Sequence, residues 1–328
     1  MNFGDFAGNE KLKERLDEMT QSGRVPHTVI FEGRKGLGKK MISRILAEAL
    51  LCTSDGQKPC HRCPDCIKID DNAHPDVKTV YAADPKKMAI DEMRNLRNDA
   101  FIKSNEGGKK IYLIFDADNM RPDSQNALLK VLEEPPSNSL FVFTCENRST
   151  FLPTILSRAS AFEVFPPSEE EAFVAVSRLC PKESKENIRK AVKLHCGNIG
   201  NSVSSLGGGR FSEIYETTFS LLEALTAASE MELIEKTAVF ENDKELFKDC
   251  MSLMRLAVRD TAANRFGVKT GLSGLDLGDL KGLYSLTTKQ LLELSDELNK
   301  LLQTLDRSPN YNLLLTRFSS RLRMAVGR

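Results

Sequence analysis

The sequence lacks several features that would mark a membrane protein, a secreted protein or a strongly charged nucleic-acid-binding protein. Lysine and arginine total 46, and so do aspartate and glutamate, so no net charge attracts DNA or a membrane surface. No apolar run approaches the roughly 18 residues that span a bilayer. Residues 1–5 lack the basic and apolar regions of a secretion signal, so we expect a cytoplasmic protein. Tryptophan is also absent, which points to no particular function.

The first half of the chain alternates strand-type runs with helical patterns. The chain has 328 residues, of which 41% are hydrophobic, enough for two or three domains with filled cores. Buried-strand candidates occur at 28–32, 77–81, 111–115, 140–144 and 161–165. Helical patterns lie near 41–50, 90–101, 122–134 and 151–157. This alternation predicts an α/β domain with a parallel sheet that helices cover on both faces.

The character of the sequence changes after Pro166-Pro167, where helical patterns take over. Ser168 followed by three glutamates predicts the start of a helix. Three consecutive glycines at 207–209 predict a linker, because they cost too much backbone entropy inside an ordered element. Further helical stretches follow at 211–266 and 287–326, with a glycine-rich stretch at 271–282 between them. We therefore expect three domains, at residues 1–166, 167–207 and 208–328.

A phosphate-binding loop follows the first strand candidate, but one of its residues is wrong for ATP hydrolysis. Residues 33–40 read GRKGLGKK, where a working loop has Gly, four residues, Gly-Lys and then Ser or Thr. Gly33, Gly36 and Gly38 let backbone N–H groups converge on an anion, and Lys39 can reach a phosphate. Lys40, however, stands where the hydroxyl that holds Mg²⁺ belongs. The sequence therefore predicts a nucleotide-binding scaffold without its metal ligand.

The acidic motif of such a site is also incomplete. The strand candidate 111–115 leads to Asp116, the carboxylate of the Mg²⁺ shell, but Ala117 replaces the glutamate that polarises the attacking water. Losing both the loop hydroxyl and this carboxylate removes two contributions that lower the barrier to hydrolysis. We expect no intrinsic ATPase activity, while weak binding of ATP or ADP through Lys39 and the loop amides stays open.

Four of the eight cysteines have the spacing of a structural zinc site. Two residues separate Cys60 from Cys63 and two separate Cys63 from Cys66, and Cys52 lies upstream at the end of the helix pattern. Four thiolates enclose a tetrahedral Zn²⁺ and leave no open position for catalysis. We predict a zinc module over 52–66, with His61 as the alternative to Cys52, or else a buried cysteine beside three loose thiols. The other four cysteines are expected in the core.

Two further motifs carry a resemblance to a known family. Residues 124–136 read SQNALLKVLEEPP, and residues 156–159 read LSRA. Together with the four-cysteine insertion after the loop helix, these motifs closely resemble the clamp-loader branch of the AAA+ ATPases, which serves the bacterial DNA polymerase III holoenzyme. The N-terminal half carries the specific motifs, whereas the C-terminal half matches in length and helical character only.

This resemblance implies an AAA+ domain with a zinc-binding insertion, a small helical lid domain and an all-α collar domain. It also implies a five-membered hetero-oligomeric ring, with a delta subunit and three gamma/tau ATPases as partners, which loads a sliding clamp onto primed DNA. The degenerate nucleotide site implies a structural and regulatory ring member. Such a subunit belongs to a DNA-directed DNA polymerase holoenzyme without polymerising DNA itself, and no membrane partner is expected.

In that family, the arginine of a Ser-Arg-Cys motif reaches the ATP of a neighbouring subunit. Arg158 matches this arginine, while Ala159 departs from the cysteine. A guanidinium suits the task because it stays charged and stabilises phosphate oxygens during transfer. The alternative for Arg158 is a surface ion pair with a carboxylate. Gly200 stands where active members often carry a nucleotide-sensing arginine, which argues further against ATP-driven motion in this subunit.

Two other functions compete with this interpretation. An active gamma/tau-type motor is disfavoured by Lys40, Ala117 and Gly200. A stand-alone zinc-dependent DNA-binding protein is disfavoured by the neutral overall charge.

Overall fold

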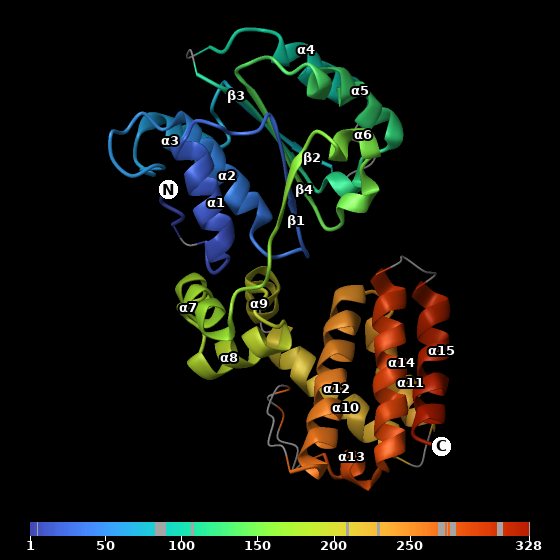
Figure 1. Cartoon of the computed structure of the whole chain (residues 1–328). Helices are drawn as coiled ribbons and strands as arrows, with labels where there is room; N and C mark the ends of the chain where they lie inside the picture. Colours follow the sequence, from blue (N-terminus) through green and yellow to red (C-terminus); the bar gives the residue numbers. More distant parts are fainter. Residues whose placement is uncertain are drawn as a thin grey trace. The chain divides into compact units, whose positions relative to one another are not determined.

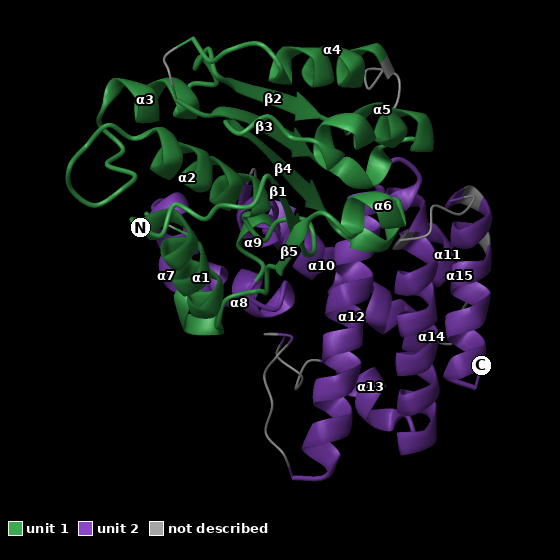
Figure 2. Cartoon of the chain, turned by 45° about the horizontal axis from the view of Figure 1, so that its top comes forward, with its two compact units in different colours: residues 1–171, 198–200 green, residues 172–197, 201–328 purple. Residues whose placement is uncertain are grey.

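The computed structural model divides the chain into two compact units. The described residues are 1–4, 6–82, 90–105, 108–207, 210–227, 230–267, 273, 275, 280–306 and 311–327. Unit 1 comprises residues 1–171 and 198–200, and unit 2 comprises residues 172–197 and 201–328 (Figure 2). The glycine linker expected at 207–209 and the glycine-rich stretch 271–282 lie largely outside the described residues. The three domain boundaries expected from the sequence stay a prediction.

Unit 1 is built on a five-stranded parallel sheet, as the alternating sequence pattern predicts (Figure 1). The strands are β1 (Thr28–Glu32), β2 (Val77–Tyr81), β3 (Lys110–Phe115), β4 (Ser139–Cys145) and β5 (Ser160–Glu163). Their order across the sheet is β2-β3-β4-β1-β5, and each neighbouring pair is parallel. The α/β class is thus confirmed, and β1 lies between β4 and β5.

One strand ends earlier than its sequence predicts. The apolar run 161–165 predicts a strand up to Phe165, but β5 ends before Val164. Val164 still donates its N–H to the Glu32 carbonyl, whereas the N–H of Phe165 bonds the Asn9 side chain. The sheet partner is lost at this point because β1 ends at Glu32 and its chain turns into the phosphate loop.

Helices cover both faces of the sheet. One apolar cluster includes residues of α1 (Glu10–Gln21), α2 (Lys39–Leu51) and α3 (Pro64–Asp70). The other includes residues of α4 (Ile90–Ala100), α5 (Pro122–Glu133) and α6 (Pro153–Leu156). The short 3-10 helices η1 (Ala117–Asn119) and η2 (Arg148–Thr150) follow β3 and β4. The segments after β1, β3 and β4 therefore meet at the carboxyl edge of the sheet, where ligands bind in folds of this class.

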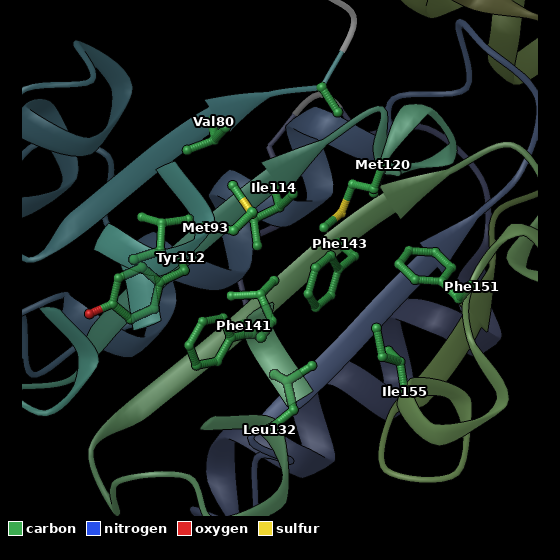
Figure 3. Packing of buried hydrophobic residues seen from close by; sticks show 14 of the residues in the cluster. Val80, Met93, Tyr112, Ile114, Met120, Leu132, Phe141, Phe143, Phe151 and Ile155 are labelled. Carbon is green, nitrogen blue, oxygen red and sulfur yellow. The ribbon is translucent and has the colours of Figure 1, made fainter. Parts of the chain in front are cut away.

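The central strands β1, β3 and β4 read as nearly continuous apolar runs because both of their faces are buried, whereas the edge strands β2 and β5 are only partly buried. Along β3, successive side chains alternate between the two apolar clusters. Figure 3 shows the cluster beneath α4, α5 and α6, in which Tyr112 and Phe141 stack with ring centroids 4.7 Å apart. Phe143 and Phe151 meet edge to face in the same cluster, at 5.5 Å. This packing fixes the strand ends that carry the candidate site.

The described part of unit 2 is helical, as its sequence pattern predicts. Its helices are α7 (Glu169–Leu179), α8 (Lys185–Leu194), α9 (Ile199–Leu206), α10 (Arg210–Thr226), α11 (Glu230–Thr237), η4 (Ala238–Phe240), α12 (Lys244–Arg265), α13 (Lys281–Ser285), α14 (Thr288–Asp306) and α15 (Tyr311–Ala325), of which α7 and α9 begin in unit 1. The Phe247 ring lies 5.0 to 5.9 Å from those of Phe240, Tyr311 and Phe318 in its core. None of the described helices is both long and apolar enough to cross a bilayer.

Candidate nucleotide-binding and metal-binding sites

The phosphate loop joins β1 to α2 and has the backbone that its glycines predict. The φ angles of Gly33, Gly36 and Gly38 are 153°, 88° and 82°, values that residues with side chains rarely adopt. A Cβ at Gly33 would lie 2.5 Å from the carbonyl oxygen of Val164. The loop therefore requires glycine for its turn and for its close approach to the strand end.

Lys39 folds back onto the loop. Its Nζ donates to the carbonyl oxygens of Gly33 and Arg34, at 2.5 and 2.8 Å, and the residue is only 8% exposed. Burial lowers the pKa of the Lys39 ammonium, while the nearby carboxylates of Glu146 and Asp118 favour its charged form. The lysine that would meet a phosphate is thus held inside the loop by backbone oxygens.

Lys40 and Asp116 meet across the edge of the sheet. The Lys40 Nζ lies 2.6 Å from Oδ2 of Asp116, which directly follows β3. The N–H of Asp116 donates to Oγ1 of the buried Thr144 at 3.0 Å. Ala117, in the position of the water-polarising glutamate, is fully buried. The residue in the hydroxyl position is therefore paired with the acidic residue of the Mg²⁺ motif.

Residues 198–200 belong to unit 1 and pack on the phosphate loop. Asn198 Nδ2 donates to the Lys35 carbonyl at 2.7 Å, and the Gly200 N–H donates to the Gly36 carbonyl at 3.0 Å. A Cβ at Gly200 would lie 2.7 Å from the Cα of Gly36 and 2.8 Å from its carbonyl oxygen. Any residue other than glycine at position 200, including arginine, would displace the loop.

Gly200→Ala is therefore expected to destabilise the loop contact. The added Cβ would meet backbone, which cannot move aside like a flexible side chain, so the free energy of unfolding should fall by about 1–3 kcal/mol. Urea unfolding measures this loss. Gly207→Ala is the matched control, since its Cβ would meet nothing within 4 Å. Equal unfolding midpoints for the two variants would contradict the contact.

Arg158 follows α6 and lies partly exposed beside the end of α5. Its Nη1 donates to the Thr154 carbonyl at 2.9 Å and to Ser157 Oγ at 3.0 Å, and its Nη2 lies 3.2 Å from Glu133 Oε1. The Arg158 and Glu133 side chains are 38% and 45% exposed, so solvent screens the pair and its contribution to stability is small. Another anion can therefore replace the Glu133 carboxylate beside Arg158 at little cost in free energy.

Gln125 is a junction residue whose role was not predicted from the sequence. It is 2% exposed, and its Nε2 donates to the carbonyls of Met120 and Thr150, at 3.2 and 3.0 Å. Its Oε1 accepts the N–H of Leu152 at 2.8 Å. These bonds tie α5 to the segment that leads into α6 and Arg158. The sequence does show a glutamine within the helix pattern of 122–134. A side-chain amide that is buried in such a helix needs hydrogen-bond partners, and this requirement could have indicated the role of Gln125.

Gln125→Ala is expected to lower the free energy of unfolding by about 2–4 kcal/mol, because it leaves three backbone groups without their partner. Asn126→Ala on the same helix is the control, since Asn126 is exposed. Chemical unfolding of both variants measures the difference. A loss for Gln125→Ala no larger than that for Asn126→Ala would contradict the junction.

Four cysteines converge in one cluster, as their spacing predicts. The sulfur atoms of Cys52, Cys60, Cys63 and Cys66 all lie within 4.8 Å of one another, so the group can hold a metal ion. The Cys63 N–H lies 3.3 Å from Cys60 Sγ, and the Cys66 N–H lies 3.5 Å from Cys63 Sγ, an arrangement that favours thiolates. Burial acts to raise the pKa of Cys63, but donation by backbone N–H groups outweighs it and lowers the pKa to about 6. Burial raises the pKa of Cys66 and of Cys52.

His61 and the remaining cysteines lie outside this cluster. His61 Nδ1 is 2.8 Å from Oε2 of the buried Glu48, so its ring faces a carboxylate. Cys145 and Cys250 are buried, as predicted. The prediction of a core position is wrong for Cys196, which is exposed in a turn with φ 50°, and Cys180 is only half-buried.

The sequence of this chain is similar to subunits of DNA polymerase III. The family profile described as "DNA polymerase III, delta subunit" matches residues 8–168. The Bacillus subtilis subunit delta' is 30% identical over 217 residues, which cover 66% of this chain and 64% of that protein. The Mycobacterium tuberculosis subunit gamma/tau is 31% identical over 185 residues, 56% of this chain and 32% of that protein. The matches thus span about one third of the length of the gamma/tau relative and just under two thirds of the length of the delta' relative.

A solved structure is also similar along most of the chain. It is a DNA polymerase III gamma subunit-related protein from Thermotoga maritima, with a TM-score of 0.45 and 15% sequence identity. The match covers 94% of this chain and 99% of that one.

Proposed function

Because residues 8–168 belong to the family of DNA polymerase III clamp-loader subunits, we propose that this protein is a delta-prime-like subunit of a bacterial clamp loader. It would occupy a five-membered ring with gamma/tau and delta subunits, which places a sliding clamp on primed DNA. We further propose an AAA+ domain at 1–166, a lid domain at 167–207 and a collar domain at 208–328.

The subunit does not hydrolyse ATP in this proposal. The observation that carries it is the Lys40–Asp116 pair at 2.6 Å, at the position of the Mg²⁺-binding hydroxyl. Ala117 provides no carboxylate to polarise a water, and Gly200 leaves no space for a sensing arginine. ATP or ADP would serve at most as a bound ligand of Gly33, Gly36, Gly38 and Lys39.

An ATPase assay on the purified chain, alone and with primed DNA, tests this proposal. We expect no turnover above background in either condition. Turnover of about 1 s⁻¹, within the usual range for enzymes, would favour the gamma/tau-type motor instead. That competitor is the natural alternative because gamma/tau subunits are among the relatives.

The catalytic contribution of the subunit is made in trans by Arg158. Its guanidinium is 38% exposed and held by a weak surface pair with Glu133, so a neighbouring phosphate can replace that carboxylate at little cost. At the γ-phosphate of a neighbour, the guanidinium would stabilise the charge of the transition state. Gln125 supports this role indirectly, since it fixes the segment that leads to Arg158.

We infer that the four-cysteine cluster holds a structural Zn²⁺. Cys52, Cys60, Cys63 and Cys66 fit this ion because four thiolates with backbone N–H groups on two sulfurs form a closed, charge-stabilised donor set. A bound Zn²⁺ would fix the connection between α2 and α3, and it would supply no chemistry to the reaction.

A further inference from the structure

The first turn of α2 carries two positive charges where a helix favours negative ones. Lys39 and Lys40 follow the N-cap Gly38, and no acidic residue lies in this turn. The N-terminus of a helix carries a partial positive charge, so an ammonium there is unfavourable unless an anion lies beside it. Lys39 is held by backbone carbonyls, whereas Lys40 has a carboxylate partner. The position of Lys40 therefore depends on Asp116.

The backbone of Asp116 is constrained in a way that directs its carboxylate to the loop. Its φ of 56° is uncommon for a residue other than glycine and costs free energy. The N–H bond to Thr144 holds this conformation. Oδ2 then lies 2.6 Å from the Lys40 Nζ, although the two residues are 76 positions apart in the chain. Asp116 thus keeps an unfavourable backbone conformation that directs its carboxylate to Lys40, although Ala117 stands in place of the glutamate that would polarise water.

Two aromatic rings complete the surroundings of the ammonium. The Lys40 Nζ lies 5.2 Å from the centroid of the Tyr81 ring and 5.7 Å from that of Phe115. The two rings meet edge to face at 5.4 Å, and Arg44 donates to the Tyr81 hydroxyl at 3.2 Å. Aromatic rings attract cations electrostatically. One carboxylate and two rings therefore form a compartment for a monovalent, hydrogen-bonding cation.

Mg²⁺ does not fit this compartment. The ion requires near-octahedral oxygen ligands and retains several waters, and aromatic carbon is no ligand for it. The hydroxyl ligand is missing, and the Lys40 ammonium already pairs with the Asp116 carboxylate that the motif provides. We propose that the Lys40 ammonium is a built-in replacement for the divalent cation of this phosphate loop, and that its pairing with Asp116 excludes Mg²⁺ from the site. This inference is independent of ring membership.

Manganese binding measured by electron paramagnetic resonance tests the replacement, with Mn²⁺ alone and Mn²⁺ with ATP as probes. The variant Lys40→Thr restores the hydroxyl and frees Asp116. We expect it to bind Mn²⁺ with ATP at least about tenfold more tightly than the unaltered protein, the scale on which changes around a metal alter its affinity. Adding Asp116→Asn to this variant should abolish the gain. Lys40→Arg keeps a cation and should show no gain.

Two results would overturn the replacement. Lys40→Thr could bind Mn²⁺ with ATP no more tightly than the unaltered protein does, or Lys40→Arg could show the same gain as Lys40→Thr. Because the Lys40 side chain is 43% exposed, these substitutions should leave the fold intact, and thermal unfolding monitored by circular dichroism verifies this for each variant.

Discussion

Arg158→Ala is expected to slow ATP hydrolysis at the neighbouring motor site by about 10³-fold or more, the scale of an arginine supplied in trans. In a reconstituted ring with three motors, the total steady-state rate should fall by at least roughly one third, because one of the three sites loses its arginine. The variant should still fold and assemble, since the side chain lies on the surface and makes only a screened ion pair and two hydrogen bonds to residues close in the chain. A coupled ATPase assay on the assembled ring measures the effect.

Three companion variants separate this role from a surface ion pair. Arg94→Ala removes another exposed arginine of unit 1 that pairs with a carboxylate, Asp91, and should leave the rate unchanged. Glu133→Gln removes the partner of Arg158 but keeps the guanidinium, and should also preserve the rate. Arg158→Lys keeps the positive charge but lacks the planar guanidinium, so it should restore only part of the ATPase rate. If Arg158→Ala preserved the ATPase rate of the ring, as Glu133→Gln is expected to do, Arg158 would have no part in the mechanism.

Cys63→Ser is expected to release one Zn²⁺ per chain and to loosen residues 52–66. The Cys63 sulfur is one of the four clustered donors; it accepts the Cys66 N–H and lies 4.0 Å from the Cys52 sulfur. Loss of a structural metal should cost on the order of 3 kcal/mol or more, which lowers the unfolding midpoint of a unit of this size by roughly 6–12 °C. Elemental analysis and thermal unfolding measure the two effects.

Two control variants make the zinc prediction specific. Cys180→Ser changes a half-buried cysteine outside the cluster and should keep the full zinc content. His61→Ala should also keep it, because the His61 ring faces Glu48. If the unaltered protein contained no zinc, the prediction of a zinc site would be wrong. If His61→Ala lost zinc, His61 would be a ligand.

The sheet could be predicted from the sequence because its three central strands, β1, β3 and β4, are buried on both faces. Strands buried on both faces give continuous apolar runs, and the observed strands match the predicted runs within one or two residues. Phe165 was misplaced because its apolar side chain is exposed and its N–H bonds Asn9, which a local pattern does not reveal. The clustering of the four cysteines followed from spacing, since their geometry is nearly local.

The pairings at the site could not be predicted in the same way. Lys40 and Asp116 were each identified as motif residues, but their contact depends on the order β3-β4-β1, which brings distant strand ends to one edge. Gly200 stands out in the sequence because it occupies the position of an expected arginine. Its contact with Gly36, however, depends on how residues 198–200 pack in unit 1. The bonds of Gln125 link three backbone segments and have no periodic signature.

Native mass spectrometry of this chain, mixed with the gamma/tau and delta subunits of its own organism, tests whether it is a member of a clamp-loader ring. We expect a five-membered assembly that contains one copy of this chain, and Lys40→Thr should assemble equally well. A chain that stays monomeric in the presence of both partners, under conditions in which those partners assemble, would contradict this membership.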